Sequence, residues 1–115
     1  MIDDAVAKLI PTLNHMRVRP GMWFREDSFV EGLYGFLLGY SISAQDHVDL
    51  KVFELGPGFS RWLVEVKQFQ GQSTQPWSEI LRQNAENDRE AFDLVFDLIS
   101  EYKDWPEIDG DLTKF

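Results

Sequence analysis

The segment from Asn87 to Asp104 constrains the fold more than any other part of the chain. Its apolar residues recur with the helical period and cover more than half of a helical wheel; they are Ala91, Phe92, Leu94, Val95, Phe96, Leu98, Ile99 and Tyr102. A helix with so wide an apolar surface needs packing partners on two sides. Asn87 followed by Glu90 resembles a capping box that starts this helix, and Pro106 marks its end. The sequence therefore predicts a central helix inside a larger helical domain.

Further helices are expected before this segment. Apolar residues at helical spacing from Val6 to Met16 predict the first, with Asp3 or Asp4 as its cap, and Pro11 is expected to kink it or divide it into two pieces. The capping-box pattern Ser28-x-x-Glu31 starts a second helix that ends near residue 44. Pro76, at a first helical position, starts a short helix with Trp77 on its inner side.

The stretch between these helices admits two interpretations. Residues 57–69 place apolar side chains on one face of a helix, whereas Leu63 to Lys67 also alternates like a strand. We therefore predict a mainly α, single domain (residues 1–115) of about five helices, with a minor β element around residues 50–67 as the alternative. Residues 105–115 are expected to form a loosely held acidic tail.

Small residues form a stripe along the second predicted helix: Ser28, Gly32, Gly35 and Gly39. Each glycine costs a helix interior about 1 kcal/mol relative to alanine. The stripe therefore predicts the close approach of another helix, with a ligand lying against bare backbone as the alternative.

Composition limits the function. The chain of 115 residues is 43% hydrophobic, contains no cysteine and carries a formal net charge of −9. The apolar share is ample for a core, the lack of cysteine fits a reducing cytoplasm, and no signal peptide or membrane-spanning run is evident. The acidic balance argues against nucleic acid and membrane partners and favours a basic protein partner.

Most of this negative charge falls between Glu86 and Asp111, and part of it forms a strip on the last helix. The strip consists of Glu90, Asp93, Asp97, Glu101 and Asp104, at steps of three and four residues. Such like-charged neighbours cost about 0.2–0.5 kcal/mol per pair, and no base follows them on this face. We expect an unneutralised surface that binds a cationic protein, with Trp105 as an aromatic anchor. The alternatives are an ordinary acidic face and a Trp105 that belongs to the core.

Residues 5–25 have the opposite charge because Lys8, Arg17, Arg19 and Arg25 are their only charged side chains. One interpretation is that this basic segment docks on acidic segments of the same fold. The other is that Arg17, Arg19 and Arg25 form an anion-binding site around the Pro20–Gly21 turn, as in a regulatory module for small molecules.

Catalytic and metal-binding patterns are absent from the sequence. His15 and His47 lie far apart, and Asp46-His47-Val48-Asp49 matches no metal-ligand spacing. Neither a G-x-S-x-G elbow nor a P-loop nor a dinucleotide fingerprint occurs. We expect a non-enzymatic protein with no catalytic residues, no metal and no cofactor.

Several short motifs occur in an order that resembles a known group. They are Arg19-Pro20-Gly21-Met22 before an aromatic residue, Gly39-Tyr40, Phe59-x-x-Trp62-Leu63, Trp77-x-x-Ile80-Leu81 and Ala91-Phe92-x-x-x-Phe96. This order is similar to small acidic bacterial proteins that we associate with immunity proteins of contact-dependent growth inhibition and other polymorphic toxin systems. The resemblance implies a cytoplasmic inhibitor that binds one basic toxin domain, for example a nuclease. A structural subunit of a larger assembly is the remaining alternative.

Overall fold

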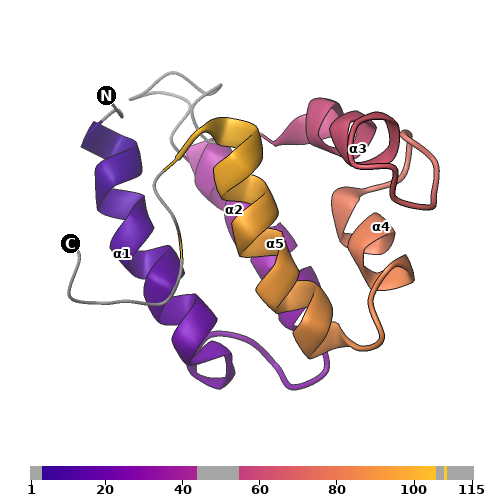
Figure 1. Cartoon of the computed structure of the whole chain (residues 1–115). Coiled ribbons are helices and arrows are strands. Elements are labelled where there is room, and N and C mark those ends of the chain that lie inside the picture. The colour runs from indigo at the N-terminus through magenta and orange to yellow at the C-terminus, as the bar shows by residue number, and fades with distance from the viewer. Residues whose placement is uncertain (1–3, 44–54, 106–107, 109–115) are drawn as a thin grey trace.

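The computed structural model describes residues 4–43, 55–105 and 108. Within these residues, five α-helices and one short 3-10 helix follow one another (Figure 1): α1 (Asp4–Val18), η1 (Pro20–Met22), α2 (Phe29–Ser43), α3 (Gly56–Glu65), α4 (Trp77–Gln83) and α5 (Asp88–Lys103). The described residues contain no strand, so the mainly α prediction is confirmed. The β alternative is wrong for residues 55–67: Leu55 caps α3, α3 itself runs to Glu65, and a turn follows it. Residues 50–54 of that alternative lie outside the described part.

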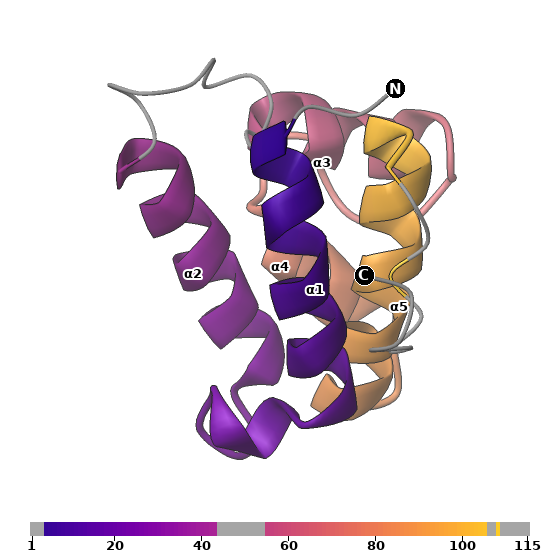
Figure 2. The ribbon, with the colours of Figure 1, turned by 90° about the vertical axis from the view of Figure 1, so that its left-hand side faces the viewer.

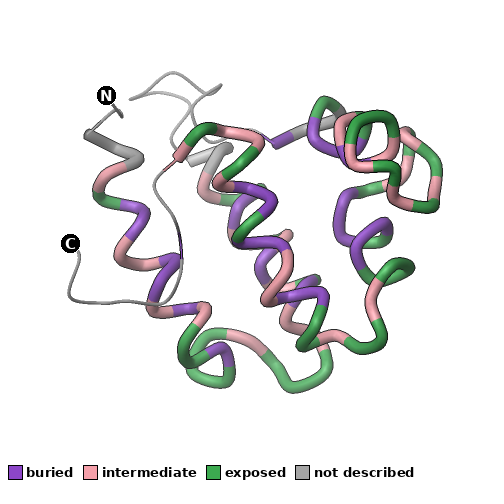
Figure 3. The backbone as a smooth tube through the Cα atoms, viewed as in Figure 1, coloured by how far each residue is buried: buried purple, intermediate pink, exposed green. Residues whose placement is uncertain are grey.

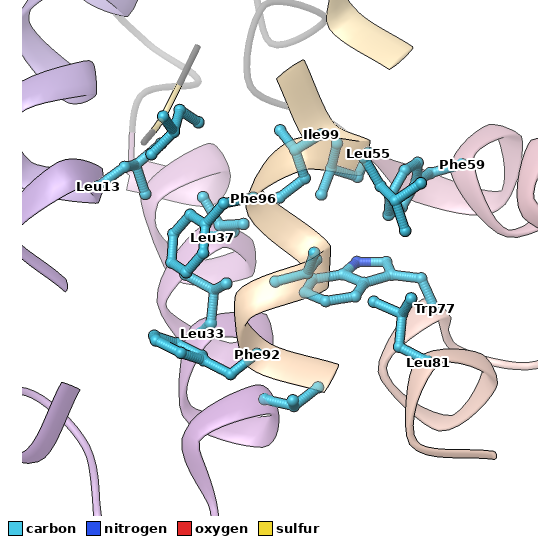
Figure 4. Close-up of a cluster of buried hydrophobic side chains, with 14 of the residues drawn as sticks. Leu13, Leu33, Leu37, Leu55, Phe59, Trp77, Leu81, Phe92, Phe96 and Ile99 are labelled. Atoms are coloured by element: carbon cyan, nitrogen blue, oxygen red, sulfur yellow. The ribbon is translucent and has the colours of Figure 1, made fainter. Parts of the chain in front are cut away.

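Helix α5 is central, as its apolar pattern predicts. It packs against α1, α2 and α4, and the three long helices α1, α2 and α5 lie side by side in Figure 2. Figure 4 shows Leu13 of α1, Leu33 of α2 and Trp77 of α4 converging on α5, where Phe92 and Phe96 are fully buried. Burial of apolar surface on several sides of α5 is therefore what holds the domain together.

Helix α1 continues through Pro11, so the predicted division into two pieces is wrong. Proline removes one backbone N–H and costs a helix interior about 3 kcal/mol. Buried apolar residues on both sides of Pro11, including Ile10 and Leu13, keep the two halves packed on one core. Tertiary packing outweighs the local preference here.

Three helix ends meet at one end of the molecule. The Asp88 carboxylate of α5 accepts hydrogen bonds from the backbone N–H groups of Phe29 (2.8 Å) and Val30 (3.3 Å), which start α2. Arg89 donates to the backbone carbonyl of Arg17 (3.3 Å), near the end of α1. Figure 1 shows α2 and α5 starting at this lower end, where α1 stops.

The capping predictions have different outcomes. At the start of α5, the Asn87 side chain accepts the backbone N–H of Glu90 at 2.9 Å, as predicted. At the start of α2, Glu31 of the predicted capping box lies 3.5 Å from Arg82 instead. The carboxylate that serves α2 is Asp88, which is about 60 residues away in sequence and therefore has no local signal.

The glycine stripe does not mark a helix crossing. A Cβ on Gly32 would lie 2.5 Å from Cδ1 of Phe24, so the close neighbour there is an aromatic side chain. A Cβ on Gly35 or Gly39 would meet no atom of the described residues within 4 Å, and both glycines are exposed. The prediction of a close helix is thus wrong for this part of α2.

The chain beyond α5 is partly anchored. Asp104 adopts a left-handed conformation (φ 57°), and Trp105 then packs against the core. Ile108 is fully buried. The prediction of a loosely held tail is wrong for Trp105 and Ile108, because both bury apolar surface; residues 109–115 lie outside the described part.

Candidate partner-binding surface

The acidic strip of α5 is largely neutralised by bases of the same chain. Arg17 binds Asp97 with Nη1–Oδ1 at 2.8 Å, and its Nε lies 3.9 Å from Asp93. Arg89 binds Asp93 at 3.1 Å. Both carboxylate oxygens of Glu101 lie 3.0 Å from Nζ of Lys67. The prediction of an unneutralised strip is wrong for Asp93, Asp97 and Glu101, because two of these bases come from distant parts of the chain.

Arg17 has a structural role. Its side chain is only 19% exposed, and Nη1 also donates to the Ile108 carbonyl at 2.6 Å. The guanidinium lies 5.7 Å from the ring centroid of Phe96. Docking of the basic segment on acidic groups of the same fold is therefore confirmed for Arg17, and the anion-site prediction is wrong for it. Arg19 and Arg25 are exposed, and neither makes an ion pair with a described residue.

The two remaining acids of the strip do not form a continuous surface. Glu90 and Asp104 are exposed and have no ion pair within the described part of the chain. A helical rise of about 1.5 Å per residue separates them by about 20 Å. Trp105 is half-buried against the core, as its alternative interpretation states, and is not an exposed anchor.

Carboxylates without counter-ions gather instead where α2 and α5 begin. We call this surface the acidic end and define it as Glu26, Asp27, Glu86 and Glu90. All four are exposed, and none pairs with a base in the described chain. An open recess lined by Glu26, Asp27, Phe29, Asn87, Asp88 and Arg89 brings the loop before α2 next to the start of α5.

Local backbone structure explains why acids are tolerated at the acidic end. Both α2 and α5 begin here, and the N-terminus of a helix carries a partial positive charge that stabilises anions. Asp27 has a left-handed backbone (φ 63°), a conformation that aspartate adopts more readily than most residues. Glu90 belongs to the strip predicted from the sequence. No sequence pattern groups it with Glu26, Asp27 and Glu86, because about 60 residues separate the two segments.

Other kinds of site receive no support from the described residues. Among them, no group of three His, Asp or Glu side chains is placed to hold a metal ion. The Asp46-His47-Val48-Asp49 segment lies outside the described residues. Within that same coverage, every helix is too short or too polar to cross a bilayer.

No protein-family model, curated protein or solved structure matches this chain. The resemblance to immunity proteins therefore stays a prediction.

Proposed function

We propose that this protein is a non-enzymatic, acidic binding protein that neutralises a basic protein domain by direct contact. The class that fits best is an immunity protein that acts in the cytoplasm on one basic toxin domain, for example a nuclease. The observation that carries the proposal is the acidic end, whose carboxylates have no counter-ion within the described chain, unlike Asp93, Asp97 and Glu101 of α5.

Charge complementarity explains how such a surface would work. An uncompensated acidic patch accelerates encounter with a basic partner and disfavours acidic ones. Carboxylates can also occupy the basic groove that a nuclease uses for phosphates. Because Asp88 anchors the start of α2 to the start of α5, both segments of the acidic end are held on one rigid surface.

The neutralised side of α5 is a weaker candidate for the contact. A partner that bound Asp97 or Glu101 would have to displace Arg17 or Lys67. In a triple variant, Asp93→Lys, Asp97→Lys and Glu101→Lys, the new side chains would face these same bases and Arg89. A loss of binding in that triple variant would therefore report damage to the fold as readily as a lost contact.

The proposal is tested by affinity capture from the native cell, using the intact tagged protein as bait. A basic protein should be retained at about 0.05 M salt and released at about 0.5 M, because salt screens exposed charges. The purified partner should then bind the protein directly and lose its own activity. Retention of acidic proteins only, or binding that is insensitive to salt, would contradict the proposal.

A further inference from the structure

An exposed apolar turn lies next to the acidic end. Its members are Val18, Met22 and Trp23, with 45%, 69% and 44% of their surfaces exposed. We call it the Met22–Trp23 turn. Figure 3 shows this part of the chain, between α1 and α2, as largely exposed. None of the three is a buried core residue, whereas the next residue, Phe24, packs against the core and lies edge-on to Phe92.

Trp23 is held in position although it is exposed. Its indole Nε1–H donates to Nδ1 of His15 at 2.8 Å, and the two rings meet edge to face with centroids 5.6 Å apart. The backbone is fixed as well, because the N–H groups of Trp23 and Phe24 both donate to the Pro20 carbonyl, at 3.0 and 2.8 Å. The turn therefore presents a large aromatic side chain in one orientation.

A fixed, exposed tryptophan is well suited to anchor a protein interface. Tryptophan is enriched among the few residues that dominate binding energy. Ordering a mobile side chain on binding costs conformational entropy, and the hydrogen bond to His15 removes part of that cost beforehand. The apolar surface that Met22 and Trp23 leave in water adds no hydrophobic stabilisation to the fold. A binding role accounts for this exposure.

The charges around the turn define its partner. Glu26 and Asp27 of the acidic end follow Trp23 by three and four residues along the chain. Two exposed bases, Arg19 and Arg25, flank the turn itself. A partner would fit with an apolar pocket for Trp23 and basic groups facing Glu26. The two arginines would repel a partner that docked with its basic groups over the turn, which fixes one orientation.

We propose that Met22 and Trp23 form the apolar anchor of the interface whose charged part is the acidic end. The occupant is the basic protein domain that the proposed function requires, and the inference rests on that function. It assigns to the turn the binding energy that surface charge alone does not provide.

The test compares affinities for the captured partner. Trp23→Ala should weaken binding by about 30-fold, the effect of losing one hot-spot residue. Trp23→Phe keeps an aromatic ring but has no N–H donor. Its affinity for the partner should lie between those of Trp23→Ala and the wild type. Val66→Ala is the matched control because Val66 is also an exposed apolar residue, 64% exposed, after α3. Circular dichroism of each variant should match the wild type, since Trp23 lies outside the core.

The outcomes separate the two proposals. Normal binding by Trp23→Ala together with weak binding by a variant of the acidic end would overturn the anchor and leave the proposed function standing. If both variants bind normally, both proposals fail. Panning random peptides on phage against the intact protein needs no natural partner: selected peptides should combine Lys or Arg with an apolar residue and lose binding to Trp23→Ala. Peptides that bind Trp23→Ala as tightly as the wild type would contradict the assignment of Trp23 as the anchor.

Two other occupants of the Met22–Trp23 turn would contradict the proposal that it binds a basic protein domain. A dimer seen by light scattering that dissociates in Trp23→Ala would show that a second copy covers the turn. A blue shift of tryptophan fluorescence with vesicles of phosphatidylserine and phosphatidylcholine, lost in Trp23→Phe, would show that a membrane does.

Discussion

Arg17 and Asp97 form a two-point contact between α1 and α5, with Nη1–Oδ1 at 2.8 Å and Nη2–Oδ2 at 3.5 Å, across 80 positions of sequence. The same Nη1 donates to the Ile108 carbonyl at 2.6 Å. One guanidinium thus joins α1, α5 and the chain that follows α5. This contact makes the acidic face of α5 part of the fold, whereas the carboxylates of the acidic end have no counter-ion within the described chain.

Replacing Arg17 with methionine, which keeps an apolar stem, should lower the free energy of unfolding by about 1–2 kcal/mol. Most of the loss should come from the Ile108 carbonyl, because Asp97 is 55% exposed and its ion pair is screened. Urea denaturation measures the change. Arg61→Met is the control, since Arg61 is exposed and has no described ion-pair partner; equal losses in both variants would contradict the structural role of Arg17.

Asp88→Ala should destabilise the protein by about 1–2 kcal/mol, the usual range for a lost helix cap. The reason is that Phe29 and Val30 would lose the acceptor of their backbone N–H groups. Thermal denaturation followed by circular dichroism measures the effect. Glu86→Ala removes a nearby exposed acid without such bonds and should have little effect; if Asp88→Ala is equally mild, α2 does not depend on this cap.

Gly35→Ala and Gly39→Ala should each stabilise the protein by about 0.5–1 kcal/mol, because alanine restricts the unfolded chain and favours the helix. At both positions a Cβ would have no neighbour within 4 Å among the residues that the structure describes. Gly32→Ala should instead destabilise, because its Cβ would meet the Phe24 ring at 2.5 Å. Urea midpoints distinguish the three variants. Destabilisation by Gly35→Ala would mean that this face of α2 is covered in solution.

The Trp23 indole N–H should exchange with solvent slowly, and His15→Phe should abolish the protection because phenylalanine provides no acceptor. Proton–nitrogen NMR of the indole signal measures the exchange rate in both proteins. Equal exchange rates in the wild type and in His15→Phe would contradict the His15–Trp23 bond.

Local patterns in the sequence predict much of the fold. The Asn87 cap and the wide apolar face predict α5 with its start at residue 88, and the approximate positions of α1, α2 and α4 follow from spacing and proline. The end of α3 is less visible: α3 stops at Glu65, four residues before the predicted Phe69, and Gln68 then takes a left-handed conformation. No residue in that segment marks such a turn.

The candidate surface is harder to predict because it depends on contacts between distant segments. A helical wheel shows that Asp97 and Glu101 share a face, but it cannot show that Arg17 and Lys67 cover that face from other elements. The interpretation that the basic segment docks within the fold is the correct one for Arg17. The exposed orientation of Trp23, beside an inward Phe24, depends on tertiary packing in the same way.

The most direct test of the central claim compares two double charge reversals in their affinity for the captured basic partner. Glu26→Lys with Glu86→Lys changes the acidic end, and Glu65→Lys with Glu79→Lys changes two exposed acids of α3 and α4 that likewise have no described ion pair. Both variants alter the net charge equally. The first should weaken binding by about tenfold or more and the second by about threefold or less, because screened charges act mainly at short range. Equal weakening by the two variants, or none, would contradict binding through the acidic end.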